Sequence, residues 1–162
     1  GLSKYVSEKI LEFNSNKFDS SIIIRYPIVI GAKKSTKDFV KYIINNAVNN
    51  NKIELYGNGA FFRNVIHISE AIFGILSALE TNRDVFYEKI NVGSSNSETV
   101  LNICKYILKE THSTSDIILS ENKGATDFDA YLDISKCSKI DYSCLTIREN
   151  IKKYLHEITN EI

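Results

Sequence analysis

The run Ile22-Ile23-Ile24 is the feature that most constrains how this chain can fold. A continuous apolar run, in place of an alternating one, is typical of a strand buried on both faces of a parallel sheet. The run lies within residues 21–31, where Pro27, the only proline in the sequence, interrupts regular strand pairing. Residues 21–31 therefore predict a strand buried in a parallel sheet, with regular pairing ending at Pro27.

Helical patterns lie on both sides of this strand. Residues 3–15 and 36–49 carry apolar side chains three or four positions apart, which marks one face of an amphipathic helix. A third helix is predicted after Ser69, which we expect to be its N-cap, with Glu70 in its first turn and an apolar stripe along one side. Further helices are predicted after Ser97 or Thr99 and over 146–158, with short strands over 53–56, 63–68, 89–92 and 116–119. Alternating helices and strands of this kind indicate an α/β fold.

Composition narrows the classes of function. The 162 residues are 43% hydrophobic and 25% charged, which suits one domain with a real core. The 20 basic and 20 acidic residues give no net charge, which argues against binding to nucleic acid and to membrane surfaces. Cys104, Cys137 and Cys144 have no metal-binding spacing, so we expect no metal and three reduced thiols in a cytoplasmic protein.

The sequence lacks a glycine-rich loop after a strand near its start. Dinucleotide-binding folds need such a loop for the cofactor phosphates, so we expect no self-contained cofactor site. The chain also contains no methionine and begins within a helical pattern. We therefore expect it to be a piece of a longer protein.

Four stretches, in order, resemble the extended short-chain dehydrogenase/reductase family of NAD-dependent sugar-nucleotide epimerases and dehydratases, of the UDP-glucose 4-epimerase type. The first, residues 1–8 (GLSKYVSE), resembles the catalytic motif Tyr-Gly-x-Ser-Lys with a glutamate four residues later. The family tyrosine would immediately precede Gly1. Because helix positions four apart share a face, the lysine cation lowers the pKa of the tyrosine hydroxyl. The resemblance implies that Lys4 is catalytic and also binds the nicotinamide ribose of the cofactor.

The second stretch, residues 25–32 (RYPIVIGA), resembles the family strand Arg-x-x-Asn-Val-Tyr-Gly-Pro. In the family this strand end passes beneath the nicotinamide and begins the substrate pocket. The resemblance therefore assigns Tyr26 and Pro27 to cofactor binding. Ile28 stands where the family usually has an asparagine that contacts the substrate. We expect Ile28 to pack in the core of the strand instead.

The third stretch, residues 53–59 (IELYGNG) and 63–70 (RNVIHISE), resembles the family pattern IYGDG…RDFIHVDD. The resemblance implies that Tyr56 lies against the nucleotide base and that Arg63 binds the diphosphate. A guanidinium suits that role because it makes charge-assisted, often bidentate bonds to phosphate. His67 is expected to satisfy a buried polar contact, and Asn64 and Ser69, which replace two aspartates, are expected to make local hydrogen bonds.

The fourth stretch is the remainder of the chain. Residues 89–94 (KINVGS) resemble YNIGSG, residues 133–136 (DISK) resemble DISKA, and residues 146–151 resemble the closing SLEEGI. The family usually has an arginine before the DISKA motif as a second phosphate ligand. Lys123 is the cation nearest to that place in this sequence, so the resemblance offers it as a substrate-binding phosphate ligand. The alternative interpretation is that Lys123 is an exposed lysine in a loop.

The resemblance implies a C-terminal part of a Rossmann-like doubly wound fold plus the small substrate-binding subdomain. Residues 1–35 would end the cofactor-domain core, and 36–162 would mainly form the nucleotide-sugar-binding subdomain, with 89–110 returning to the cofactor-domain sheet. The chain would be the substrate-binding part of an NAD(P)-dependent epimerase, dehydratase or reductase, inactive alone without the phosphate loop and the tyrosine. Its partners would be a nucleotide-diphosphate sugar, the missing N-terminal half and, as an option, a second copy in a homodimer. A non-catalytic nucleotide-sugar-binding homologue and a partner-binding module remain alternatives.

Without the other half, we expect apolar surface to stay uncovered on Ile22–Ile24 and on Val6, Ile10 and Phe13. The isolated chain should therefore self-associate or be marginally soluble. Size-exclusion chromatography with light scattering checks this, and a monodisperse monomer that melts cooperatively would contradict it.

Overall fold

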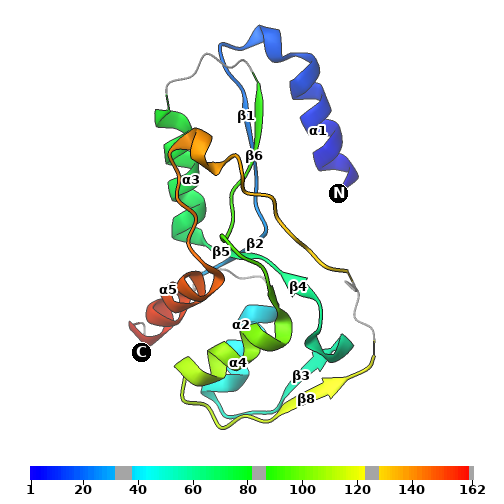
Figure 1. Cartoon of the computed structure of the whole chain (residues 1–162), viewed down its shortest axis with the longest axis vertical. Coiled ribbons are helices and arrows are strands. Elements are labelled where there is room, and N and C mark those ends of the chain that lie inside the picture. Colours follow the sequence, from blue (N-terminus) through cyan, green and yellow to red (C-terminus); the bar gives the residue numbers. More distant parts are fainter. Residues whose placement is uncertain (32–37, 82–86, 123–127, 161–162) are drawn as a thin grey trace.

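The computed structural model describes residues 1–31, 38–81, 87–122 and 128–160. Helices and strands alternate along the chain, as the sequence predicts (Figure 1). The α-helices and strands are α1 (Leu2–Phe13), β1 (Ile22–Arg25), β2 (Ile28–Ile30), α2 (Phe39–Val48), β3 (Ile53–Tyr56), β4 (Phe62–Arg63), β5 (Val65–His67), α3 (Ile68–Glu80), β6 (Glu88–Asn91), β7 (Glu98–Thr99), α4 (Val100–Glu110), β8 (Ile117–Ser120) and α5 (Ile147–Asn160). Three short 3-10 segments are η1 (Ser15–Lys17), η2 (Gly57–Gly59) and η3 (Cys137–Ile140).

The predicted strand over 21–31 is two strands that pair with different partners. β1 runs parallel to β6, with Ile22 opposite Glu88, and β2 runs parallel to β5, with Ile28 opposite Val65. The change of partner falls at Tyr26 and Pro27, since proline has no N–H to continue the ladder. The same parallel pairing joins β3 to β8, while β4 and β7 are antiparallel.

Two apolar cores share β2 and β5, whose side chains alternate between them. The larger core gathers α2, β3, α4 and α5 around Ile43, Ile107 and Tyr154, all nearly inaccessible to solvent. The smaller core lies between α3, β6 and η3 and contains Ile90, Val92 and Ile140. β6 pairs with β1, whereas α4 packs against α2 and α5. The division into a cofactor part and a substrate part stays a prediction.

Helix α3 differs from its prediction in two respects. Its N-cap is His67, whose side chain accepts the Ser69 N–H, so the predicted cap at Ser69 is wrong. The face that packs inward carries small residues, and a Cβ on Gly74 would stand only 2.8 Å from Val92 Cγ1. The large apolar side chains of the predicted stripe are exposed on the other face: Ile68, Ile72, Ile75, Leu76 and Leu79.

Helix α1 has no buried residue. Polar contacts hold it to the rest of the chain: Arg25 donates two hydrogen bonds to Glu8, one of them from Nε at 2.8 Å, and Lys89 Nζ lies 3.1 Å from Glu12. The apolar side chains of α1 are exposed, including Phe13 at 88%. The sequence predicts this open surface on α1, while Ile22–Ile24 on β1 are half-buried.

Glu88 anchors the segment that precedes α5 to β6. Its two carboxylate oxygens lie 2.6 Å from Lys136 Nζ and 2.8 Å from Lys139 Nζ. The hydrogen bonds from Lys136 and Lys139 lower the pKa of Glu88 from 4.5 to about 2. The carboxyl therefore stabilises the fold in its charged form, and that stability is present above pH 4.5 and is lost as the pH falls towards 2.

We expect Glu88→Gln to lower the free energy of unfolding at pH 7 by about 1–2 kcal/mol, because both lysines are half exposed and their attraction is screened. Urea unfolding from pH 7 to pH 2 measures the difference from wild type, which should shrink below pH 4.5. Glu110→Gln, at the exposed end of α4, is the matched control. A pH-independent loss in Glu88→Gln would contradict this account.

Candidate functional site

Arg63 is almost buried, with 9% of its surface exposed, in the short strand β4. Its Nη1 donates to two backbone carbonyls, Phe62 O at 2.7 Å and Phe128 O at 2.6 Å. The guanidinium carbon lies 5.8 Å and 5.7 Å from the ring centres of Phe61 and Phe128, within the range of a cation–π contact. Arg63 therefore joins β4 to the segment that begins at 128.

Tyr56 lies at the end of β3, and 56% of its surface is exposed. The turn that follows has positive φ at Gly57 (58°) and Gly59 (63°), a conformation that favours glycine. A Cβ on Gly57 would also come within 2.6 Å of the Phe61 ring. Of the two predicted nucleotide contacts, Tyr56 directly precedes this turn and Arg63 follows it in β4.

The predicted cofactor contacts lie on other elements. Lys4 is exposed in the first turn of α1, whose N-terminal end is directed, in Figure 1, towards the part of the molecule that holds β4. Tyr26 donates its hydroxyl to Ala71 O at 2.9 Å, and burial raises its pKa, so it also fixes α3 on the sheet. Lys123 lies outside the described residues. That Lys4 and Arg63 share one cleft stays a prediction.

Asn64 fixes the turn that follows β6. Its Nδ2 donates to Ser94 O and to Asn96 O, both at 2.9 Å, and its Oδ1 accepts the Ser94 N–H at 2.9 Å. The sequence predicts local hydrogen bonds here, but the structure shows bonds across 30 residues or more. An aspartate could accept the Ser94 N–H but could not make the other two bonds, because a carboxylate has no hydrogen to donate to the two carbonyls. A Cβ on Gly93 would stand 3.1 Å from Pro27 Cγ, so this turn lies close against the break between β1 and β2.

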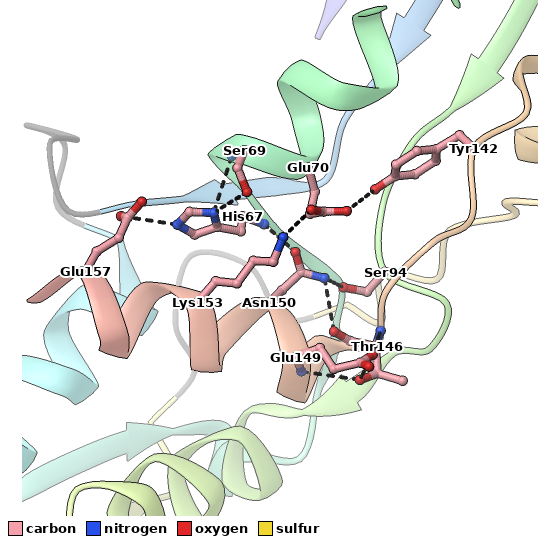
Figure 2. A network of polar contacts seen from close by, with 10 residues as sticks. All are labelled: His67, Ser69, Glu70, Ser94, Tyr142, Thr146, Glu149, Asn150, Lys153 and Glu157. Carbon is pink, nitrogen blue, oxygen red and sulfur yellow. Dashed lines mark hydrogen bonds and ion pairs between the residues drawn. The ribbon is translucent and has the colours of Figure 1, made fainter. Parts of the chain in front are cut away.

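Asn150 of α5 holds the other side of the same turn (Figure 2). Its Oδ1 accepts the His67 N–H at 2.7 Å, and its Nδ2 donates to Ser94 Oγ and Thr146 O, both at 3.0 Å. The Ser94 hydroxyl in turn donates to Val65 O. Sequence analysis missed Asn150, although an asparagine between two inward-facing isoleucines of a helix was the available signal.

His67 satisfies buried polar contacts, as predicted (Figure 2). The ring is 2% exposed, and Nδ1 lies 2.9 Å from Ser69 Oγ and accepts the Ser69 N–H at 3.3 Å. In a neutral ring the proton is then on Nε2, which faces Glu157 Oε2 at 3.2 Å. That contact is not aligned as a hydrogen bond, so it is electrostatic in character.

Sequence analysis placed Glu70 in the first turn of α3 but missed the buried contacts that its carboxylate makes. Glu70 accepts a hydrogen bond from the Tyr142 hydroxyl at 3.1 Å and is paired with Lys153 of α5 (Figure 2). Burial first, and the negative charge of Glu70 second, raise the pKa of Tyr142 far above its ordinary value. These polar groups join α3, α5 and the segment after η3.

Other kinds of site find no support among the described residues. In that part of the chain no three His, Cys, Asp or Glu side chains gather where they could hold a metal ion. None of the helices over 1–31, 38–81, 87–122 and 128–160 has the length and apolar character to cross a membrane.

Residues 1–93 match the NAD dependent epimerase/dehydratase family. The chain belongs to this family. The matched range includes Lys4, Tyr26, Pro27, Tyr56 and Arg63. No curated protein matches the sequence.

Several solved structures share the fold from end to end. A UDP-glucose 4-epimerase of Thermotoga maritima, solved with UDP-glucose, superposes with a TM-score of 0.84 at 18% identity over 99% of this chain and 53% of its own. A UDP-glucuronic acid 4-epimerase of Bacillus cereus, in complex with UDP-glucuronic acid and NAD, gives 0.82 at 20% identity over 99% and 52%. A UDP-N-acetylglucosamine 4-epimerase of Methanobrevibacter ruminantium gives 0.82 at 18% identity over 98% and 53%. This chain thus spans about half the length of these structures, and its α/β fold is that of their Rossmann-like architecture.

We expect Asn64→Asp to destabilise the protein by about 2 kcal/mol at pH 7, even though aspartate is usual at this place in the resembling family. The substitution removes both donated hydrogen bonds and sets a carboxylate against two carbonyl oxygens. Because a protonated carboxyl can donate one of them, part of the loss should be recovered below pH 4. Chemical unfolding at several pH values measures it, with Asn45→Asp on the exposed side of α2 as the control. Equal effects of the two substitutions would contradict the role given to Asn64.

Proposed function

We propose that this chain is the substrate-binding half of an NAD(P)-dependent enzyme that acts on a nucleotide-diphosphate sugar. The observation that carries the proposal is that the family match covers residues 1–93, the range that contains both Lys4 and Arg63. The solved structures that share the fold support it, since one was solved with UDP-glucose and another with UDP-glucuronic acid and NAD. The reaction would be an epimerisation, dehydration or reduction.

Tyr56 and Arg63 would hold the nucleotide. The exposed Tyr56 ring would offer a stacking surface to the base, and the Arg63 guanidinium in β4 would offer donors to the diphosphate. The two aromatic rings beside Arg63 and the carbonyls of Phe62 and Phe128 would fix the direction of the guanidinium before the ligand arrives. A preorganised donor loses less freedom on binding, which favours affinity.

Lys4 fits a role beside the nicotinamide ribose. Its ammonium is exposed and carries three donors, which suit a ribose diol. Bound NAD(P) would accept and return a hydride at the sugar carbon. In this chain, Lys4 would orient the ribose and favour ionisation of a tyrosine one helical turn earlier, while Tyr26 and Pro27 would line the floor of the pocket. A location in the cytoplasm is part of the same proposal.

The cofactor phosphates would be held by an N-terminal half, which would also cover open surfaces of this chain. β1 pairs with β6 alone among the described strands, so its second edge is open to a further parallel strand. Next to that edge, a hollow of about 570 Å³ is lined by Ile22, Ile24, Ile75 and Leu79. The exposed apolar faces of α1 and α3 flank the same region.

Titration with UDP tests the base contact. Tyr56→Ala should weaken UDP binding about tenfold, because stacking on an aromatic ring contributes about 1–3 kcal/mol per base. Tyr5→Ala, which removes a tyrosine with the same exposed fraction of 56% from α1, is the matched control and should bind as wild type. Calorimetry measures both, and the absence of saturable binding in wild type would overturn the pocket assignment for this chain.

A second titration separates phosphate binding from the structural role of Arg63. Arg63→Lys keeps the charge but loses the planar fork, so UDP affinity should fall about tenfold while the affinity for uridine, which has no phosphate, stays unchanged. Arg148→Lys on α5 controls for the loss of a guanidinium beside a ring. If UDP and uridine weaken equally in Arg63→Lys, the guanidinium serves the fold alone.

A further inference from the structure

Cys137 and Cys144 lie in contact beside the end of β6, and the proposed function uses neither of them. Their sulfur atoms are 3.1 Å apart. A disulfide bond is about 2 Å long, so a side-chain movement of about 1 Å brings the two atoms to bonding distance. Between them, η3 and the left-handed residue Asp141 (φ 48°) fold the chain back on itself, which is why thiols seven residues apart meet.

The two thiols differ in exposure and in their hydrogen bonds. Cys137 is 4% exposed, and its S–H donates to Asn91 O at 3.1 Å, whereas Cys144 is half-buried. The hydrogen bond between the sulfurs lowers the pKa of Cys144 and raises that of Cys137. In the neutral pair Cys144 donates to Cys137, and a Cys144 thiolate would instead accept the Cys137 S–H.

The surroundings of the pair act in both directions. The Gly93 N–H faces both sulfurs and favours a thiolate, while burial and the negative charge of Glu70 oppose one on Cys144. The net effect leaves Cys144 as the more acidic and the more accessible thiol. A thiolate with some exposure is the form that attacks disulfides.

We propose that Cys137 and Cys144 are a reversible dithiol/disulfide pair that exchanges with low-molecular-weight disulfides. The Cys144 thiolate attacks one sulfur of the small disulfide, forms a mixed disulfide and releases the first small thiolate. Cys137 then gives up its proton and attacks the Cys144 sulfur, which forms the bond within the protein and releases the second small thiolate. The protein loses two hydrogen atoms and two electrons, and the small disulfide becomes two thiols.

The bond would fix the segment from η3 to Cys144 on the sheet. This segment carries Tyr142, which donates to Glu70 on α3, and it follows Lys136, which pairs with Glu88 on β6. Closing a short loop restricts the unfolded chain, so the oxidised form should be the more stable one. Cys104 lies fully buried in the other core, and burial raises its pKa to about 11, so it should not react.

Oxidised glutathione is the probe for the experiment. Folded wild-type protein should lose two hydrogen atoms in intact mass spectra, and peptide mapping after alkylation should show a Cys137–Cys144 link and a free Cys104. The midpoint of thermal unfolding should rise by roughly 5–10 °C and return on reduction. Cys137→Ser, which lacks the second thiol, should instead accumulate a glutathione adduct on Cys144, and Cys144→Ser should react far more slowly.

The double variant Cys137→Ser with Cys144→Ser is the control and should show neither an adduct nor a shift in melting. Wild type that stays alkylatable at both cysteines after glutathione disulfide would overturn the proposal, and this readout needs no variant to fold. Equal rates of adduct formation at Cys137 and Cys144 in the single variants would overturn the order of attack. Neither result depends on nucleotide binding.

Discussion

The turn at Ser94 is the constraint on which the rest of this structure depends. Asn64, next to β5, binds its backbone from one side, and Asn150 of α5 binds its hydroxyl from the other. The same Asn150 accepts the His67 N–H at the end of β5. Because all these groups are buried, each needs its partner, and the loss of one leaves others unsatisfied. This polar clamp fixes the end of β6 relative to β5 and α5.

A second constraint acts at Pro27, where the chain changes partner strand. β1 pairs with β6 and contributes to the smaller core, whereas β2 pairs with β5 and both of these strands contribute to both cores. The close approach of Gly93 to Pro27 brings the clamped turn against this change. The predicted floor of the nicotinamide pocket is therefore at the place where the two cores meet, which suits a site that must bring two ligands together.

Buried and exposed polar residues have different roles in this chain. Four buried polar residues bind other parts of the chain and therefore stabilise the fold: Asn64, His67, Glu70 and Asn150. Lys4 and Tyr56 are exposed and belong to the proposed site. Arg63 has both characters, since its guanidinium is nearly buried yet stands beside the turn that carries Tyr56.

The sequence by itself determined the α/β order, the family and most element positions, because helical and strand periodicities are local and the motifs keep their order. It predicted α1, β3, β6, β8 and α5 closely, along with the buried role of His67. Only the tertiary structure decided that the strand over 21–31 divides between two partners, and that α3 packs through Ala71, Gly74 and Ala78 with its large apolar side chains outward. The tertiary structure alone revealed the buried hydrogen bonds of Asn150 and Glu70 and the contact between Cys137 and Cys144. The reason is physical: periodicity shows that a face is apolar or polar, but the atoms that will cover or bond to that face lie tens of residues away and are fixed only when the chain packs.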